Sequence, residues 1–197
     1  QVRGNYPKET RAPNISEVCS PQGTGLGNFS VDPCTRSAPN GNADLLAVCL
    51  AQGAPANTIG GIVVDPAGQV NQTSGGNLNL AAEKADTYTI GAIFQPEAFP
   101  GLSLTVDYYN IKVEDAITSP TPDDVFSSCF GPGFDSGNYT LTSASAASAA
   151  CTGIRRNPET GNLFGNVATT FGLPTVLTNQ GTLETSGIDV TANYVFD

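Results

Sequence analysis

Few side chains in this sequence are suited to catalysis or to metal binding. The chain has no His, so it lacks both the usual general base and the commonest zinc ligand. It also has no G-x-S-x-G sequence, the turn that presents a nucleophilic Ser in many hydrolases. Two carboxylate pairs, Asp123 with Asp124 and Asp32 with Asp44, offer oxygen ligands for calcium, but their spacing matches no EF-hand. We therefore expect no catalytic residue, no metal site and no cofactor, and we predict that the protein is not an enzyme.

The cysteines indicate disulfide chemistry. Cys19, Cys34, Cys49, Cys129 and Cys151 all lie in segments rich in Gly, Pro, Ser and Asn, and no C-x-x-C sequence occurs. This pattern favours disulfides formed in an oxidising compartment. The pairs Cys34–Cys49 and Cys129–Cys151 would each close one local loop and leave Cys19 unpaired. The sequence alone does not fix this connectivity.

Composition excludes some classes of partner. The net charge is -10, and only 13% of the 197 residues are charged. Nucleic-acid binding needs a basic face, so we expect no nucleic-acid partner. No run of about 18 apolar residues is present, which predicts no transmembrane helix. The first residue is not Met and no signal segment follows it, so we expect a processed product or a fragment.

Three segments have the two-residue period of β-strands. They cover residues 87–94, 102–108 and 186–197. Their apolar positions share one face: Tyr88, Ile90, Ala92, Phe94, Leu102, Leu104, Val106, Tyr108, Ile188, Val190, Ala192, Tyr194 and Phe196. The opposite face carries mainly Thr, Ser, Gly, Asp and Asn. The short connection "QPEAFPG" predicts that the first two strands are antiparallel neighbours. A change of phase after Tyr109 predicts a bulge near Asn110.

Two long segments, 14–83 and 118–184, separate these strands and hold all five Cys. We expect them to be loops, with a tight turn at "DPAGQ", residues 65–69. Loops of this length are unusual in compact soluble domains. Outer-membrane barrels combine short turns on one side with long loops on the other, and they need an apolar outer face bounded by aromatic residues. The pattern alone leaves a soluble sandwich and a membrane barrel open.

Several segments resemble one family. The stretch "NLNLAAEKADTYTIGAIFQPEAFPGLSLTVDYYNIKVEDAI" closely resembles the barrel region of TonB-dependent outer-membrane receptors. "RAPNISEV", "VDPC" and "TSGIDVTANYVF" resemble further family segments in the same order, so the resemblance covers residues 11–197. Cys19 departs from it, since the family usually has Phe or Leu there, and "RGNYPKET" alternates poorly for the strand expected before "RAPN".

The resemblance implies a fold class and a location. We expect an all-β chain of antiparallel strands from a transmembrane β-barrel, present in part, with long disulfide-bearing extracellular loops. The strands would lie near 84–95, 102–114 and 185–197, and the loops would be 14–83 and 118–184. A family barrel has about 22 strands, of which this chain would supply roughly four to six, without the plug domain. The location would be the Gram-negative outer membrane, in contact with lipid.

The resemblance also implies a function and candidate contacts. The parent receptor would import a scarce small-molecule nutrient, such as a siderophore, a cobalamin-like molecule or an oligosaccharide. Energy would come from TonB, contacted through an N-terminal region that is absent here. Candidate ligand contacts next to the expected loops are Tyr6, Arg11, Arg36, Tyr139, Arg155 and Arg156.

An alternative is an extracellular structural or fibre-forming protein, assembled by pairing of strand edges between chains. In such a setting the sequons at Asn14, Asn28, Asn71 and Asn138 could carry glycans. The mass of the intact native chain would distinguish a long receptor from a short assembling protein.

Overall fold

The computed structural model describes residues 1–64 and 67–195. Part of the turn expected at 65–69 and the last two residues of the expected strand 185–197, including Phe196, lie outside this range. The chain divides into two compact units. The first, which we name the sheet unit, comprises Gln1–Val18, Asn79–Thr118 and the chain from Thr178 onward. The second, which we name the disulfide unit, comprises Cys19–Leu78 and Ser119–Leu177.

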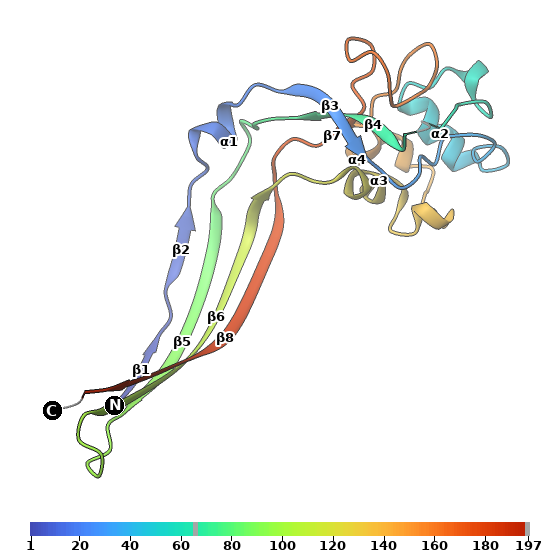
Figure 1. Cartoon of the computed structure of the whole chain (residues 1–197). Helices are drawn as coiled ribbons and strands as arrows, with labels where there is room; N and C mark the ends of the chain where they lie inside the picture. Colours follow the sequence, from blue (N-terminus) through green and yellow to red (C-terminus); the bar gives the residue numbers. More distant parts are fainter. Residues whose placement is uncertain (65–66, 196–197) are drawn as a thin grey trace. The chain divides into compact units, whose positions relative to one another are not determined.

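The sheet unit is one antiparallel sheet of long strands (Figure 1). Its three long strands are β5 (Glu83–Phe94), β6 (Leu102–Thr118) and β8 (Thr178–Tyr194), and β8 forms one edge. Two short strands, β1 (Val2–Asn5) and β2 (Lys8–Arg11), both pair with β5 on the outer edge. Tyr6 and Pro7 interrupt this edge. Pro has no N–H to donate to a neighbouring strand, so an edge of the sheet tolerates it better than the interior does. Helix α1 (Ile15–Cys19) follows β2.

The strand register places the expected apolar residues on one face. Ile90 lies opposite Tyr108, which lies opposite Ile188, and Ala92, Val106 and Val190 form the next row. The bulge expected near Asn110 is wrong, since the pairing of β6 continues unbroken through this residue. Ile111 and Val113 instead lie on the same face as Tyr109. The register shifts further along, between Val113 and Ile117, where Asp115 has a φ of 57°.

The disulfide unit combines a small sheet with helices. Strands β3 (Gly23–Asn28) and β4 (Gln69–Ser74) are antiparallel, and β7 (Leu173–Pro174) pairs with β4 in parallel. The helices are α2 (Ala43–Ala51), α3 (Pro122–Phe130) and α4 (Ala149–Thr152), with 3₁₀ turns η1 (Ala56–Thr58), η2 (Phe134–Ser136) and η3 (Ser145–Ala147). The expectation of an all-β chain was therefore wrong here, and the segments expected to be loops hold a folded unit.

Local sequence explains where the two longer helices begin. The Asn42 side chain accepts a hydrogen bond from the backbone N–H of Leu45 and so caps α2. Thr121 and Asp124 form a reciprocal capping box at the start of α3, and Pro122 occupies the first helical position. Both helices place apolar residues and one Cys on their inner face.

All the buried hydrophobic residues of the described chain belong to the disulfide unit. Phe126 of α3 lies at the centre of this core, with ring centroids 5.6 Å from Phe134, 6.0 Å from Phe29 and 6.1 Å from Phe130. Leu45 and Val48 of α2 are fully buried in the same cluster. None of the described residues of the sheet unit belongs to a buried hydrophobic core.

Candidate functional site

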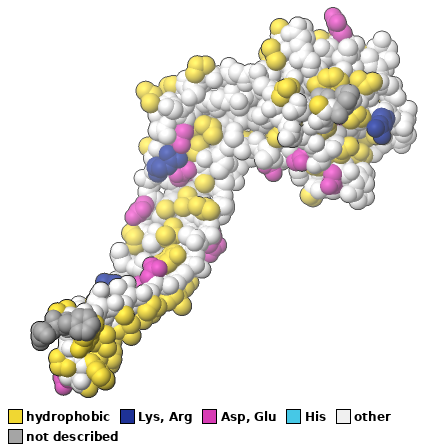
Figure 2. All heavy atoms as spheres, viewed as in Figure 1, with side chains coloured by type: hydrophobic (Ala, Val, Ile, Leu, Met, Phe, Trp, Pro, Cys, Tyr) yellow, Lys and Arg dark blue, Asp and Glu magenta, His cyan; other side chains and the backbone are white. Residues whose placement is uncertain are grey.

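The apolar face of the sheet unit is uncovered. Phe94, Ile188 and Val190 have exposed fractions of 61%, 67% and 64%, although all three lie in the sheet. Hydrophobic side chains gather on the part of the sheet nearest the 95–101 turn (Figure 2). In a soluble sandwich a second layer would bury this face. Within the described residues no such layer exists, so the sandwich that the sequence left open does not describe this sheet.

Aromatic side chains border the apolar band at both ends. Tyr88 and Tyr108 meet edge to face at the border far from the turn, with ring centroids 6.4 Å apart. Phe94 and Tyr194 lie near the turn on the same face. The six residues from Tyr88 to Phe94 span roughly 20 Å along the strand. Tyr109 does not belong to this border, since it lies on the opposite face.

The opposite face of the sheet carries mainly polar and small side chains near the turn. One cross-strand row contains Arg3, Gly91, Asp107 and Asp189. Arg3 reaches across Gly91 and binds Asp107 through two hydrogen bonds of 2.9 and 2.5 Å. A Cβ at Gly91 would lie 1.8 Å from the Asp107 carboxylate. A side chain at this position would displace the Asp107 carboxylate from the place where it binds Arg3.

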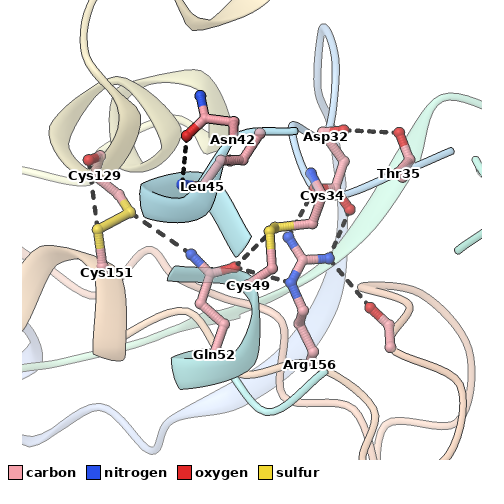
Figure 3. Close-up of a disulfide and its surroundings, with 11 residues drawn as sticks. Asp32, Cys34, Thr35, Asn42, Leu45, Cys49, Gln52, Cys129, Cys151 and Arg156 are labelled. Carbon is pink, nitrogen blue, oxygen red and sulfur yellow. Dashed lines mark hydrogen bonds and ion pairs between the residues drawn. A yellow bond between two sulfur atoms is a disulfide. The ribbon is translucent and has the colours of Figure 1, made fainter. Parts of the chain in front are cut away.

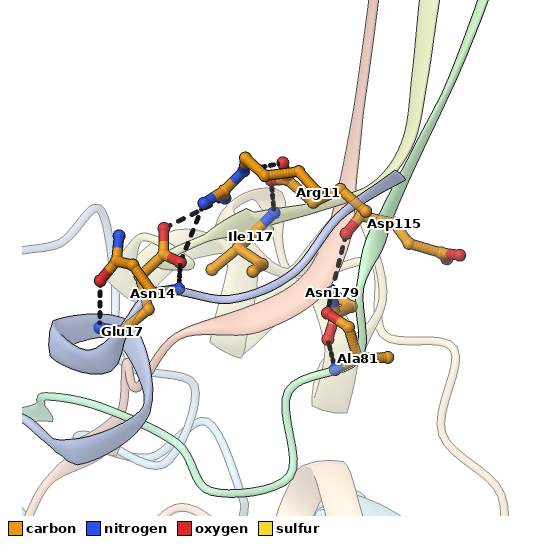
Figure 4. A network of polar contacts seen from close by, with 8 residues as sticks. Arg11, Asn14, Glu17, Ala81, Asp115, Ile117 and Asn179 are labelled. Atoms are coloured by element: carbon orange, nitrogen blue, oxygen red, sulfur yellow. Dashed lines mark hydrogen bonds and ion pairs between the residues drawn. The ribbon is translucent and has the colours of Figure 1, made fainter. Parts of the chain in front are cut away.

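A polar network ties together the strand ends far from the turn (Figure 4). Arg11 binds Glu83 and also makes two hydrogen bonds to Glu17, of 3.0 and 3.1 Å. The Arg11 guanidinium holds the pKa of the Glu17 carboxyl below its usual range. Asn179 completes the network, because its side chain donates to the carbonyls of Ala81 and Asp115 at 2.9 and 2.8 Å.

The two disulfides of the second unit flank one glutamine. Cys34 is bonded to Cys49 and Cys129 to Cys151, the pairs that local loop closure favoured, and Cys19 is free and exposed. Figure 3 shows Gln52 between them, with its side chain 3.7 Å from the Cys34 sulfur and 3.6 Å from the Cys129 sulfur.

Gln52 also contacts a buried ion pair. Arg156 donates from Nε to the Gln52 side-chain oxygen at 2.8 Å and from two nitrogens to the Asp32 carboxylate, each at 2.7 Å. Both charged side chains are almost completely buried, with exposed fractions of 0% and 4%. This pair therefore belongs to the interior of the disulfide unit.

The disulfide unit contains a cleft of about 410 Å³ next to β3 and β7. Its polar side chains are Gln22, Thr24, Thr73 and Arg155. The Arg155 guanidinium lies 4.0 Å from the centre of the Phe171 ring, which also lines the cleft. No carboxylate lines this cleft in the described part of the chain.

Backbone contacts fix both sides of the cleft. Arg155 and Gly172 exchange two backbone hydrogen bonds of 2.9 Å. The Thr73 hydroxyl donates to the Phe171 carbonyl at 3.0 Å. Asn71 is fully buried and donates its side-chain amide to the carbonyls of Gly165 and Thr170. The strand β4 thereby positions the segment that carries Phe171.

The structure separates the residues expected to contact a ligand. Arg11 forms ion pairs with Glu17 and Glu83, and Arg156 is buried in its ion pair with Asp32. Tyr6 is exposed on the sheet unit, with its hydroxyl 3.4 Å from Asp86. Only Arg155 lines the cleft, and sequence reasoning missed its partners Gln22, Thr24, Thr73 and Phe171, which carry no recognisable motif.

The other two candidates lie elsewhere in the disulfide unit. Arg36 is exposed, and its backbone N–H bonds to Ile62. Tyr139 packs edge to face on Phe130 at 6.3 Å, and burial raises the pKa of its phenol. Neither residue joins Arg155 in one site.

Three of the four carboxylates considered for calcium have structural partners. Asp32 binds Arg156, Asp124 caps α3, and Asp123 accepts hydrogen bonds from Ser30. Among the residues that the structure describes, no group of three or more His, Cys, Asp or Glu side chains could hold a metal ion.

The sequons differ in accessibility. Asn14, Asn28 and Asn138 are exposed. Asn71 is fully buried with its amide nitrogen bonded twice, so a glycan at this position is incompatible with the structure.

Comparison with known protein families identifies the family of this chain. The family model described as TonB dependent receptor-like, beta-barrel matches residues 1–197. The chain belongs to the TonB-dependent receptor-like β-barrel family. Searches among curated proteins and among solved structures found no match.

Family membership connects the geometry to a class of function. Proteins of the TonB-dependent receptor family are outer-membrane receptors that act in transport, which confirms the predicted family and the predicted class of function. The sheet unit of this TonB-dependent receptor chain is open at both edges. None of the helices in residues 1–64 and 67–195 is long and apolar enough to cross a membrane.

Proposed function

We propose that the sheet unit is a section of the barrel wall of an outer-membrane receptor that imports a scarce nutrient. The observation that carries this proposal is the uncovered apolar face of β5, β6 and β8 with its aromatic borders. An outer-membrane barrel needs an outward apolar band about 25 Å tall with aromatic girdles. Lipid then covers the side chains that no protein layer covers.

The orientation follows from the connections between strands. The short turn 95–101 joins β5 and β6, whereas the chain leaves the opposite strand ends for the disulfide unit. Short turns are periplasmic in these barrels and long connections are extracellular. The disulfide unit is therefore extracellular in this proposal, where an oxidising environment preserves both disulfides.

The polar face of the sheet is the lumen side in this proposal. Its Thr, Ser and Gly residues and the Arg3–Asp107 pair tolerate water. The edges at β1–β2 and at β8 pair with further strands of the same receptor. Pairing of these edges with other copies in an extracellular assembly is the alternative, and the mass of the native particle distinguishes the two.

The nutrient is a small molecule of the siderophore, cobalamin-like or oligosaccharide classes. Import through the barrel would draw energy from TonB through the N-terminal part of the receptor. The cleft at Arg155 is the candidate contact surface for the ligand because it offers polar groups beside an aromatic ring.

Neighbouring residues of β8 provide a matched test of the membrane face. Val190 lies on the apolar face and Thr191 on the polar face. An Arg on the lipid face near the bilayer midplane costs about 2–4 kcal/mol, whereas a lumen position tolerates charge. We expect Val190→Arg to abolish accumulation of folded receptor in the outer membrane and Thr191→Arg to preserve it. Equal accumulation of the two variants would contradict the proposal.

A further inference from the structure

Arg155 is an unpaired cation in an acidic chain. The sequence has eight Lys and Arg against 18 Asp and Glu. Six of the basic residues form ion pairs: Arg3, Lys8, Arg11, Lys84, Lys112 and Arg156. Across the described residues, Arg36 and Arg155 form none. Of these two, only Arg155 lies beside an aromatic ring in a cleft.

The Arg155 side chain is positioned before any ligand arrives. Its backbone is fixed by the pair of hydrogen bonds with Gly172, and the next residue, Arg156, is anchored to Asp32. Its guanidinium lies over the Phe171 ring and makes no hydrogen bond to the described residues. The planar fork of N–H donors is therefore available to an oxyanion.

The other walls of the cleft select among oxyanions. Thr24 and Thr73 provide hydroxyl groups 3.3 Å apart, and Gln22 provides an amide. Phe171, with an exposed fraction of 42%, and Pro174 provide apolar surface. One cation matches the single charge of a carboxylate, whereas a phosphate ester carries about -1.5 to -2. The hydroxyl and amide groups suit a ligand that itself bears hydroxyls.

We propose that this cleft binds a polyhydroxylated carboxylate, with the carboxylate on Arg155 and the hydroxyls on Thr24, Thr73 and Gln22. The chemistry is shared by uronic acids and by open-chain hydroxycarboxylates. The proposal rests on the proposed function in that it names the class of the imported nutrient. A cleft of about 410 Å³ falls within the usual range for small ligands.

Saturation-transfer NMR on the full-length receptor in detergent micelles tests this inference with three probes. D-galacturonate is a uronic acid, D-galactose is its neutral counterpart, and D-gluconate is an open-chain polyhydroxylated acid with a single carboxylate. We expect at least one of the two acids to bind at least tenfold more tightly than galactose. Binding of galacturonate alone identifies the ligand as a ring-form uronic acid, and binding of gluconate alone identifies an open-chain acid.

Substitutions assign the binding to the cleft. Arg155→Gln should reduce the affinity for the bound acid at least tenfold, Arg155→Lys should retain part of it, and Arg36→Gln should leave it unchanged. Failure of both acids to bind, equal binding of galactose, or unchanged acid binding by Arg155→Gln overturns the inference.

Outer-membrane fractionation of the same variants distinguishes a failure of the ligand proposal from a failure of the barrel-wall proposal. Wild-type receptor in the outer membrane without acid binding contradicts only the ligand class, and acid binding by a protein absent from that membrane contradicts the wall function.

Discussion

Arg155 and Arg156 are neighbours in the chain with opposite surroundings. Arg156 is fully buried on Asp32 and Gln52, whereas Arg155 is exposed over Phe171. The sequence "GIRR" placed both next to an expected loop and gave no reason to separate them. The difference depends on Asp32 and Gln52, which are more than 100 residues away in the sequence. A contact between residues so far apart in the sequence leaves no local pattern from which it could be predicted.

This contrast predicts unequal effects on stability. Arg156→Gln leaves the Asp32 carboxylate buried without its partner, so we expect a loss of about 3–5 kcal/mol in the free energy of unfolding. Denaturant unfolding followed by near-ultraviolet circular dichroism, with the disulfides intact, measures this loss. The matched control is Arg155→Gln, for which we expect a change within about 0.5 kcal/mol because the residue is exposed. Similar losses in both variants would contradict the assignment of Arg156 to the interior.

The space available to residue 91 is limited by the Asp107 carboxylate on the neighbouring strand. Gly91→Ala brings a Cβ into contact with the Asp107 carboxylate, so this carboxylate must move from its present position beside Arg3. We expect a smaller destabilisation by Gly91→Ala when Asp107 is already Ala, because the clash with the carboxylate is gone. A double-mutant cycle on unfolding free energies, with coupling of at least about 0.5 kcal/mol, checks this. Additive effects would show that the two residues do not interact.

At the scale of secondary-structure elements, the alternation of apolar and polar residues was sufficient to predict the long strands but not the helices. β5, β6 and β8 have clear period-two patterns, so their shared apolar face followed from the sequence. Helix signals were also present, namely Asn42 before α2 and the box of Thr121 and Asp124 before α3. They lie in segments rich in Gly, Pro and Ser, which led to the interpretation as loops.

The sequence contains no pattern from which the small sheet of the disulfide unit could be predicted. β3 reads Gly-Thr-Gly-Leu-Gly-Asn, and β7 has two residues, Leu173 and Pro174. β7 pairs with β4 across about a hundred residues of chain. Short strands without alternation form because the disulfide unit already holds their backbones together, so their existence depends on tertiary structure.

The capping box of α3 predicts a dependence of stability on pH. The Asp124 carboxylate accepts hydrogen bonds from the Thr121 side chain and backbone, and these lower its pKa from 3.8. Because the folded pKa is depressed, the stabilisation is complete above about pH 4–5 and is lost as pH falls through the folded value. We expect Asp124→Asn to be less stable than wild type at pH 7, with the difference shrinking below pH 3.8.

Thermal unfolding of both proteins between pH 7 and pH 2.5 measures this difference. Thr121→Ala is the companion variant, and loss of its cap should cost about 1 kcal/mol. A difference between wild type and Asp124→Asn that stays constant across the whole pH range would contradict the role of the ionised carboxylate.

At the scale of the whole molecule, the two units are built for different surroundings. The disulfide unit buries Phe126, Phe130 and their neighbours in a hydrophobic core of the kind found in water-soluble domains. Two disulfides cross-link this core. The sheet unit exposes Ile188, Val190 and Phe94, and its described residues form no buried core. The shared apolar face was predictable from the sequence because alternation is local, and the family was predictable from the resemblance of several segments. The disulfide unit's packing and the cleft were not, because they depend on distant contacts.

Cys19 offers the most direct measurement of the central claim, since it is a free and exposed thiol in the disulfide unit. Intact cells that make the full-length receptor are treated with a membrane-impermeant maleimide, before and after permeabilisation of the outer membrane. We predict that Cys19 is labelled in intact cells, that Cys19→Ser is not labelled, and that Glu97→Cys in the Cys19→Ser background is labelled only after permeabilisation. Labelling of Glu97→Cys in intact cells, or protection of Cys19 until permeabilisation, would contradict an outer-membrane wall with the 95–101 turn inside and the disulfide unit outside.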